Sequence, residues 1–337
     1  MYYRLSLVEQ KSTLSDRDLA QAYETLAKVS AENVWLANFH SENTKAVYKN
    51  AVGDFINEMG IDSPDKLYNA SQAHIVAWRD LLKSKGLKNA TIRNRLAALS
   101  SLYKFLSDKQ LSRHNPVSGV LRPNSGKSGV GVGKTPALTR KQVRLLLDAP
   151  FTHTGKRRIS ELQKLRDRAI LHLYFYTGGR CSEPARLKVE DFRQDHGLWV
   201  VEFTTKGEKI NIVAIGEVGD ENAECVQALQ EYLDASGHQQ NKSAPLFLAV
   251  KFGQNRQQPM TRGNFYALFK KYVKLTSLPD KVTPHSARAT FITQAYDMGI
   301  SGEDIQRTVN HSSITTTESY NQSAKKLRKS AALGMHY

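Results

Sequence analysis

The chain has 337 residues, of which 40% are hydrophobic and 9% aromatic, the composition of a folded protein and not of a disordered one. This length exceeds what one hydrophobic core usually organises, so the sequence predicts two domains. Lys and Arg number 48 against 32 Asp and Glu, a net charge of +16 that predicts a polyanionic partner. Nucleic acid is the first candidate, because the charge is spread along the chain and not gathered on one amphipathic, membrane-binding helix.

Targeting signals and cysteine frameworks are both missing from the sequence. Residues 1–12 hold no apolar run of signal-peptide length, and no stretch of about 18 apolar residues occurs anywhere. We therefore expect a cytoplasmic protein with no membrane partner. The two cysteines, Cys181 and Cys225, cannot build a disulfide framework and lack neighbours at zinc-ligand spacing, so we interpret Cys225 as a packing residue.

The N-terminal part of the chain has the pattern of a small all-helical domain, which we assign to residues 41–121. Apolar residues recur there at helical intervals in three stretches: 44–56, 75–82 and 92–106. Residues 15–37 have helical spacing as well, and we assign residues 1–40 to a partly helical N-terminal extension.

Residues 122–136, RPNSGKSGVGVGKTP, have the composition of a flexible linker. They contain four glycines, two serines and two prolines. The run also resembles a phosphate-binding P-loop, but that motif would need glycine where Ser128 stands and a strand before it. We therefore place the domain boundary here and favour the linker over a nucleotide site.

Residues 137–322 mix helices with a short β segment, and we assign them to a second domain. Two β-rich runs flank the sequence TTKGE, which predicts a hairpin. The predicted elements are a helix over 167–176 that ends at Gly178-Gly179, strands over 198–203 and 209–215, helices over 261–274, 284–298 and 302–309, and a short helix carrying Tyr320.

The sequence TPHSAR predicts a helix start, with Thr283 as the cap and Pro284 in the first turn, where its missing N–H costs nothing. His285 and Arg288 then share one face close to the positively polarised end of the helix, which suits a phosphate. A His-x-x-Arg pair alone is more often a solvated helix face, so its meaning depends on the surrounding residues.

Further reactive residues stand at fixed distances from this pair. Arg180 follows a Gly-Gly turn, with Glu183 three residues on, while His311 lies 23 residues after Arg288 and Tyr320 nine residues after His311. The segments TGGRCSE, TTKGEK, HSAR and VNHSSITTTESY together resemble the tyrosine recombinases, which include the Xer, Cre and phage integrase groups. The match runs in order and spacing through the second domain, and the helical first domain resembles the core-binding (SAM-like) domain of that family.

The resemblance implies a role for each matched residue: Arg180 and Arg288 bind phosphate, His285 and His311 are the histidines, Lys206 is the hairpin lysine, Tyr320 is the nucleophile and Glu183 orients Arg180. Arginine offers fixed, bidentate donors to the charge that develops on phosphate oxygens under attack. A tyrosine hydroxyl, with a pKa of about 10, needs nearby cations or a base such as His285. The departing 5′-hydroxyl needs a proton, for which a lysine at a hairpin tip is the candidate donor.

Each of these residues also has an ordinary structural interpretation. Tyr320 could be a core aromatic residue, His311 a helix cap, Lys206 a turn lysine and Glu183 a surface charge. Their joint occurrence in this order favours the recombinase interpretation over that alternative.

Two positions depart from the family pattern. Gly179 stands where a large apolar residue is common, and Val309-Asn310 replaces Leu-Gly before His311. Asparagine tolerates left-handed backbone geometry nearly as glycine does, so we expect Asn310 to make the same turn. Neither departure removes a reactive group.

We expect no cofactor, neither metal nor nucleotide. No cluster of Asp and Glu at metal-binding spacing accompanies the reactive residues, which disfavours a two-metal mechanism. A phosphotyrosine bond would conserve the energy of the broken phosphodiester, so ATP would be unnecessary.

The resemblance implies a mainly α fold with a small antiparallel β-sheet, built as two domains that clamp duplex DNA. It also implies a homotetramer on two recombination sites, working through a Holliday junction to integrate, excise or resolve DNA such as a mobile element, with accessory DNA-bending proteins as further partners. Such a protein would lie at the nucleoid. Residues 323–337 form a basic tail that we expect to dock on a neighbouring protomer, with a frayed tail that only adds phosphate affinity as the alternative.

Two other functions stay open from sequence. A type IB topoisomerase-like or telomere-resolving enzyme uses the same set of residue types but does not need paired sites. A non-catalytic, architectural DNA-binding protein would retain the set without using it, and the completeness of the set argues against that reading.

Overall fold

A computed structural model describes residues 30–124, 135–152, 159–205, 209–249 and 258–321. In these ranges the chain is mainly helical with one small antiparallel sheet, which confirms the predicted fold class. The N-terminal extension before residue 30, most of the expected linker, Lys206 and the C-terminal tail lie outside the described residues. The chain divides into two compact units, Met1–Lys127 and Ser128–Tyr337.

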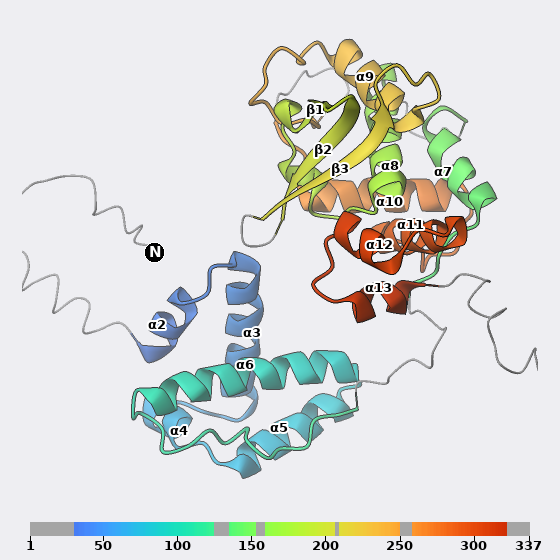
Figure 1. Cartoon of the computed structure of the whole chain (residues 1–337). Helices are drawn as coiled ribbons and strands as arrows, with labels where there is room; N and C mark the ends of the chain where they lie inside the picture. The colour runs from blue at the N-terminus through green and yellow to red at the C-terminus, as the bar shows by residue number, and fades with distance from the viewer. Residues whose placement is uncertain (1–29, 125–134, 153–158, 206–208, 250–257, 322–337) are drawn as a thin grey trace, which may run out of the picture. The chain divides into compact units, whose positions relative to one another are not determined.

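The first unit is a helical bundle (Figure 1). Its helices are α2 (Ala31–Ala37), α3 (Glu42–Glu58), α4 (Pro64–Tyr68), α5 (Gln72–Ser84) and α6 (Asn89–Asp108). The hydroxyls of Ser30, Ser41 and Ser63 cap α2, α3 and α4 by accepting a backbone N–H that has no partner inside the helix. Trp35 of α2 is buried in the same core as Trp78 of α5, so the bundle includes residues ahead of residue 41.

The second unit combines a three-stranded antiparallel sheet with helices around it (Figure 1). Its elements are α7 (Arg140–Thr152), α8 (Glu161–Thr177), β1 (Phe192–Asp195), β2 (Leu198–Thr204), β3 (Ile210–Glu217), α9 (Glu224–Ser236), α10 (Arg262–Leu275), α11 (Pro284–Met298), α12 (Gly302–Thr308) and α13 (Ile314–Tyr320). The predicted hairpin is confirmed, since β2 pairs with β3 and Thr204 lies opposite Ile210. The strand β1 was not predicted, because Phe192 is the one apolar residue in its sequence FRQD.

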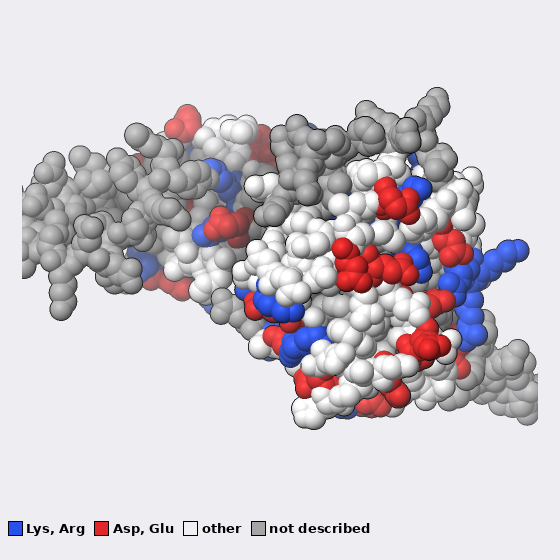
Figure 2. All heavy atoms as spheres, turned by 90° about the horizontal axis from the view of Figure 1, so that it is seen from above, with Lys and Arg blue, Asp and Glu red and all other residues white. Residues whose placement is uncertain are grey.

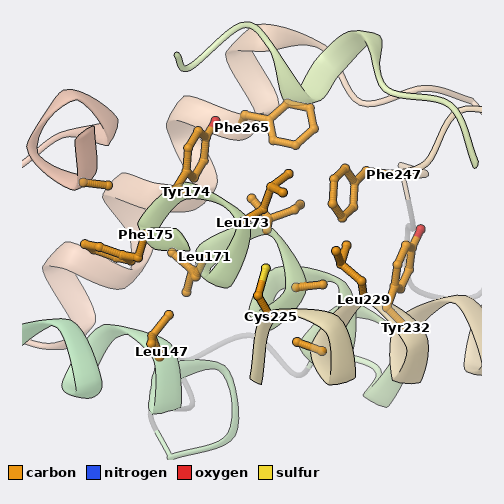
Figure 3. Close-up of a cluster of buried hydrophobic side chains, with 14 of the residues drawn as sticks. Leu147, Leu171, Leu173, Tyr174, Phe175, Cys225, Leu229, Tyr232, Phe247 and Phe265 are labelled. Carbon is orange, nitrogen blue, oxygen red and sulfur yellow. The ribbon is translucent and has the colours of Figure 1, made fainter. Parts of the chain in front are cut away.

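The core of the second unit lies around α8, whose residues from Ala169 to Phe175 are all buried. Figure 3 shows side chains from several elements meeting there, among them Leu147 of α7, Leu173 of α8, Leu229 of α9 and Phe265 of α10. Cys225 is fully buried in this cluster, which confirms that it is a packing residue. A rigid α8 therefore supports the loop that follows it at Gly178.

Helices α11, α12 and α13 form a smaller cluster of their own. Ile292 of α11, Ile305 of α12 and Val309 are buried together, and Tyr320 packs against them. The predicted helix 284–298 is confirmed to the residue, beginning at Pro284 after the cap Thr283 and ending before the left-handed Gly299. This cluster packs the ends of α12 and α13 against the middle of α11.

None of the helices in the described ranges combines the length and hydrophobicity that crossing a bilayer requires.

Candidate active site

The loop after α8 carries Arg180 and depends on glycine at residue 178. Gly178 has a φ of 60°, and a Cβ atom there would lie 2.8 Å from the ring of Phe291, so both the backbone and the space exclude a side chain. Arg180 follows two residues later. Its Nη1 lies 2.7 Å from Glu183 Oε1, while its backbone N–H donates to Glu183 Oε2 at 2.6 Å. Glu183 thus fixes both the backbone and the guanidinium of Arg180.

Arg288 projects from the first turns of α11 and is only 2% exposed. Its Nη1 donates to the carbonyl of Gly178 at 2.7 Å, its Nη2 to the carbonyl of Val309 at 2.6 Å and its Nε to His311 Nε2 at 3.2 Å. Burial and the nearby charge of Arg180 lower the pKa of Arg288 to about 10, so it remains charged at neutral pH. Its bonds join the ends of α8 and α12.

The three residues after α12 connect both arginines. The carbonyl of Val309 accepts a hydrogen bond from Arg288, and the next carbonyl, that of Asn310, accepts one from Arg180 Nη2 at 2.7 Å. The ring of His311 accepts a hydrogen bond from Arg288 Nε. Asn310 has a φ of 50°, which confirms that it makes the expected left-handed turn. Consecutive carbonyls can point at different arginines because this turn redirects the chain.

The ring of His311 lies between Arg288 and the candidate nucleophile. Since Arg288 donates to Nε2, the ring proton of the neutral form is on Nδ1, which lies 2.9 Å from Thr317 Oγ1. Burial and the charges of Arg288 and Arg180 lower the pKa of His311 to about 4, so the ring is neutral at pH 7. Tyr320, the last residue of α13, stacks on this ring with centroids 5.5 Å apart.

His285 lies exposed in the first turn of α11, one turn before Arg288. Partial burial and the charges of Arg288, Arg180 and Arg262 lower its pKa. The ring makes no hydrogen bond with any residue of the described ranges. Among the described residues, its nitrogens therefore have no partner that would compete with a substrate.

Lys206 lies outside the described residues, but the residues on either side of its loop are described. The backbone N–H of Thr205 donates to the carbonyl of Lys209 at 2.7 Å, which closes the base of the hairpin. Of the sequence-predicted set, the structure therefore brings together Arg180, Glu183, Arg288, His311 and Tyr320, with His285 on the same helix as Arg288.

Four residues near the site, Thr317, Asn310, Thr205 and Arg262, were not predicted to belong to it. Thr317 binds the His311 ring, the amide of Asn310 donates to Thr205 Oγ1, and the charge of Arg262 acts on His285. Thr317 is one of three consecutive threonines, and nothing in its local sequence distinguishes it from the other two. Only the turn of Asn310 had a signal in the sequence.

The arrangement suits a tetrahedral anion. Three of the five N–H donors of Arg288 bind protein atoms of the described ranges, which leaves two for a ligand, and Arg180 likewise has donors beyond its two partners. Two guanidinium groups and neutral histidine rings can therefore bind a phosphate group and stabilise added charge on its oxygens. Within the described residues, no three His, Cys, Asp or Glu side chains are grouped to hold a metal ion.

The sequence matches known families over both units. Residues 136–326 match the phage integrase family, and residues 31–110 match the phage integrase N-terminal SAM-like domain. The chain belongs to the phage integrase family. Tyrosine recombinase XerC of Syntrophus aciditrophicus is 30% identical over 75% of this chain and 76% of its own length. Tyrosine recombinase XerD of Corynebacterium glutamicum is 28% identical over 88% and 92%, respectively.

Solved structures of a recombinase and an integrase share the fold. The XerH site-specific recombinase bound to a palindromic difH substrate, a post-cleavage complex, covers 96% of this chain and 91% of its own, with a TM-score of 0.66 and 18% identity. A lambda integrase dimer bound to a COC′ core site covers 91% and 76%, with a TM-score of 0.62 and 16% identity. Together with the family match, these findings make the chain a tyrosine site-specific recombinase, an enzyme of DNA strand breakage and rejoining.

Proposed function

We propose that Tyr320 cleaves one DNA strand by attacking a phosphodiester between Arg180 and Arg288. The bond from the tyrosine oxygen to phosphorus forms and the bond from phosphorus to the 5′-oxygen breaks, which leaves a 3′-phosphotyrosine and a free 5′-hydroxyl. His285 takes the tyrosine proton and Lys206 supplies the proton to the leaving oxygen. Attack by a 5′-hydroxyl from the partner strand reverses the step, so the reaction needs no ATP.

The observation that carries this proposal is the segment after α12. Val309, Asn310 and His311 bind both arginines, and the His311 ring stacks on Tyr320. Two cationic donors and a tyrosine are thereby held by one short segment, which is the preorganisation that charge stabilisation in a transition state requires.

The electrostatics of the site favour an anionic substrate. Burial and, after it, the charges of Arg288 and Arg180 lower the pKa of both His285 and His311. A bound phosphate would offset those charges and raise the pKa of both rings. Neutral His285 can accept the tyrosine proton, and the imidazolium that forms is then stabilised by the phosphate beside it.

DNA binding would use the side of the second unit that carries the site. Figure 2 looks from above Figure 1, and on this face the acidic side chains gather in groups, so that its described residues form no continuous basic surface. Helices α12 and α13 are drawn on the lower side of their unit in Figure 1. We propose that the helical unit binds the same duplex as a core-binding domain, with residues 122–136 as linker, so that the chain clamps the DNA.

The proposed assembly is a homotetramer on two recombination sites that exchanges strands through a Holliday junction, at the nucleoid. Its support is a lambda integrase tetramer bound to a Holliday junction, which shares the fold with a TM-score of 0.62 and 17% identity. Accessory DNA-bending proteins would add to this assembly.

The proposal is tested by covalent capture on nicked suicide duplexes made from the DNA that flanks the gene. The expected result is a protein–DNA adduct in the presence of EDTA, and sequencing its junction identifies the cleaved site. Tyr320→Phe should bind the same duplex without forming the adduct. An adduct with this variant, or strict dependence on Mg²⁺, would overturn the assignment.

A further inference from the structure

The end of β2 is attached to the segment after α12 through one side chain. Thr205, which follows β2, is 5% exposed, and its hydroxyl accepts a hydrogen bond from the amide Nδ2 of Asn310 at 3.0 Å. The same hydroxyl donates to the carbonyl of Lys209 at 3.0 Å, beside the backbone bond that closes the hairpin. The base of the hairpin is thus held by Asn310, which is 105 residues further along the chain.

The backbone of Asn310 reaches the other side of the site. Its carbonyl accepts from Arg180 Nη2 at 2.7 Å, in a left-handed conformation that asparagine and glycine adopt with less strain than other residues. Glycine would supply this turn and this carbonyl, but it has no amide to reach Thr205. The Asn310 side chain therefore adds a contact that the turn itself does not need.

We propose that Asn310 is a positioning residue for cleavage. Its amide fixes the base of the β2–β3 hairpin, whose loop contains Lys206, relative to Arg180. Thr205 directly precedes Lys206 in the sequence, so a shift at Thr205 is passed to the residue assigned as general acid. This inference rests on the proposed function of Lys206. It predicts that losing the amide impairs protonation of the leaving group and leaves phosphate binding by the arginines intact.

The test measures the rate of covalent capture on two versions of the nicked suicide duplex. One has the natural 5′-oxygen as the leaving group, and the other has a 5′-bridging sulfur, which leaves as a thiolate and needs no proton. Asn310→Gly keeps the left-handed turn and removes only the amide. Its cleavage rate on the oxygen substrate should fall between about twofold and tenfold, the range for one neutral hydrogen bond. On the sulfur substrate its rate should equal that of the unchanged chain.

Thr205 provides the reciprocal variants. Thr205→Val removes the hydroxyl and should reproduce the leaving-group dependence, Thr205→Ser should restore most of the rate, and the double variant with Asn310→Gly should be no slower than Thr205→Val alone. Asn211→Ala is the matched control, because Asn211 Nδ2 donates to the carbonyl of Thr308 at 3.0 Å and joins β3 to α12 without contacting Asn310. Asn211→Ala should lower the cleavage rates of both substrates by the same factor, or change neither rate.

Several results would overturn the inference. Equal slowing of Asn310→Gly on both substrates would mean that the amide acts on the arginines or on folding, and an unchanged rate on both would mean that the contact has no role. The same sulfur-dependent loss in Asn211→Ala would assign the effect to general docking of the sheet. Lys206→Ala is measured in parallel. If the sulfur substrate does not restore its cleavage rate, Lys206 is not the general acid and the proposed function fails at that residue. If the sulfur substrate restores the rate of Lys206→Ala but not that of Asn310→Gly, only the role of Asn310 is refuted.

Discussion

Replacing Arg288 by alanine should both slow cleavage strongly and destabilise the fold, whereas Arg180→Ala should slow cleavage strongly with a smaller effect on stability. The two arginines share the proposed task of binding phosphate but differ in their surroundings. Arg288 is 2% exposed and joins three segments, while the side chain of Arg180 is 38% exposed. We therefore expect Arg288→Ala to lower both stability and activity, and Arg180→Ala to lower mainly activity.

The stability cost at Arg288 follows from the groups that it would leave behind. The carbonyls of Gly178 and Val309, both in buried residues, would lose their donors, and each unpaired buried group costs about 1–3 kcal/mol. The cavity left by the side chain adds to this cost, while removal of a desolvated charge offsets part of it. We expect a net loss of about 3 kcal/mol for Arg288→Ala. For Arg180→Ala the partly exposed pair with Glu183 and the hydrogen bond to the half-buried Asn310 carbonyl predict a smaller loss, about 1–2 kcal/mol.

Denaturant unfolding followed by circular dichroism measures the stability difference, and the rate of covalent capture measures cleavage. Both variants should capture DNA at least about 100-fold more slowly, the effect of losing one preorganised donor to a developing charge. Equal unfolding midpoints for the two variants would refute the argument from burial. Near-normal capture by Arg288→Lys would refute the need for a bidentate guanidinium, because lysine cannot form that fork.

Two further predictions concern the residues after Gln322 and the buried His172. Deleting the residues after Gln322 should leave single-site binding largely intact but weaken pairing of sites, measured by gel shift, and normal recombination with weaker binding would make the tail a purely electrostatic element. His172 is 2% exposed, and burial, followed by the charge of Arg168, lowers its pKa from 6.5 to about 4. The folded state then binds fewer protons than the unfolded state between these values, so stability present above pH 6.5 is lost as the pH falls, by about 2 kcal/mol between pH 7 and pH 5. His172→Phe should remove this acid-dependent loss in urea unfolding, and an unchanged pH dependence would place the sensitive group elsewhere.

Local features of the sequence were sufficient to predict much of the second unit. Helix α11 has its cap Thr283, its first-turn Pro284 and its terminal Gly299 within the element itself, so its bounds could be predicted from sequence alone. The hairpin β2–β3 was predictable for the same reason, since two β-rich runs flank a short polar loop. Helices α7 and α9 were missed.

The contacts that organise the site could not be predicted in this way. Arg288 binds Gly178 across 110 residues and Val309 across 21, and nothing near any of these residues indicates the partner. The pKa of His311 depends on burial and on Arg288 and Arg180, which reach it only in the folded chain. Residue types and spacing predicted the set, whereas geometry and electrostatics depend on tertiary packing.

The two departures from the family pattern both lie next to the end of β2. A Cβ atom at Gly179 would lie 3.2 Å from Thr177 Oγ1, 3.4 Å from Glu183 Oε2 and 3.8 Å from the ring of the buried Phe203. Asn310 contacts Thr205, two residues further along the chain from Phe203. The loop of Arg180 lies next to β2 at Gly179, which has no side chain. The segment after α12 contacts the residue that follows β2 through the amide of Asn310. A larger residue at 179 would therefore press first on Thr177 and on the Glu183 carboxylate that binds Arg180, before it reached the ring of Phe203.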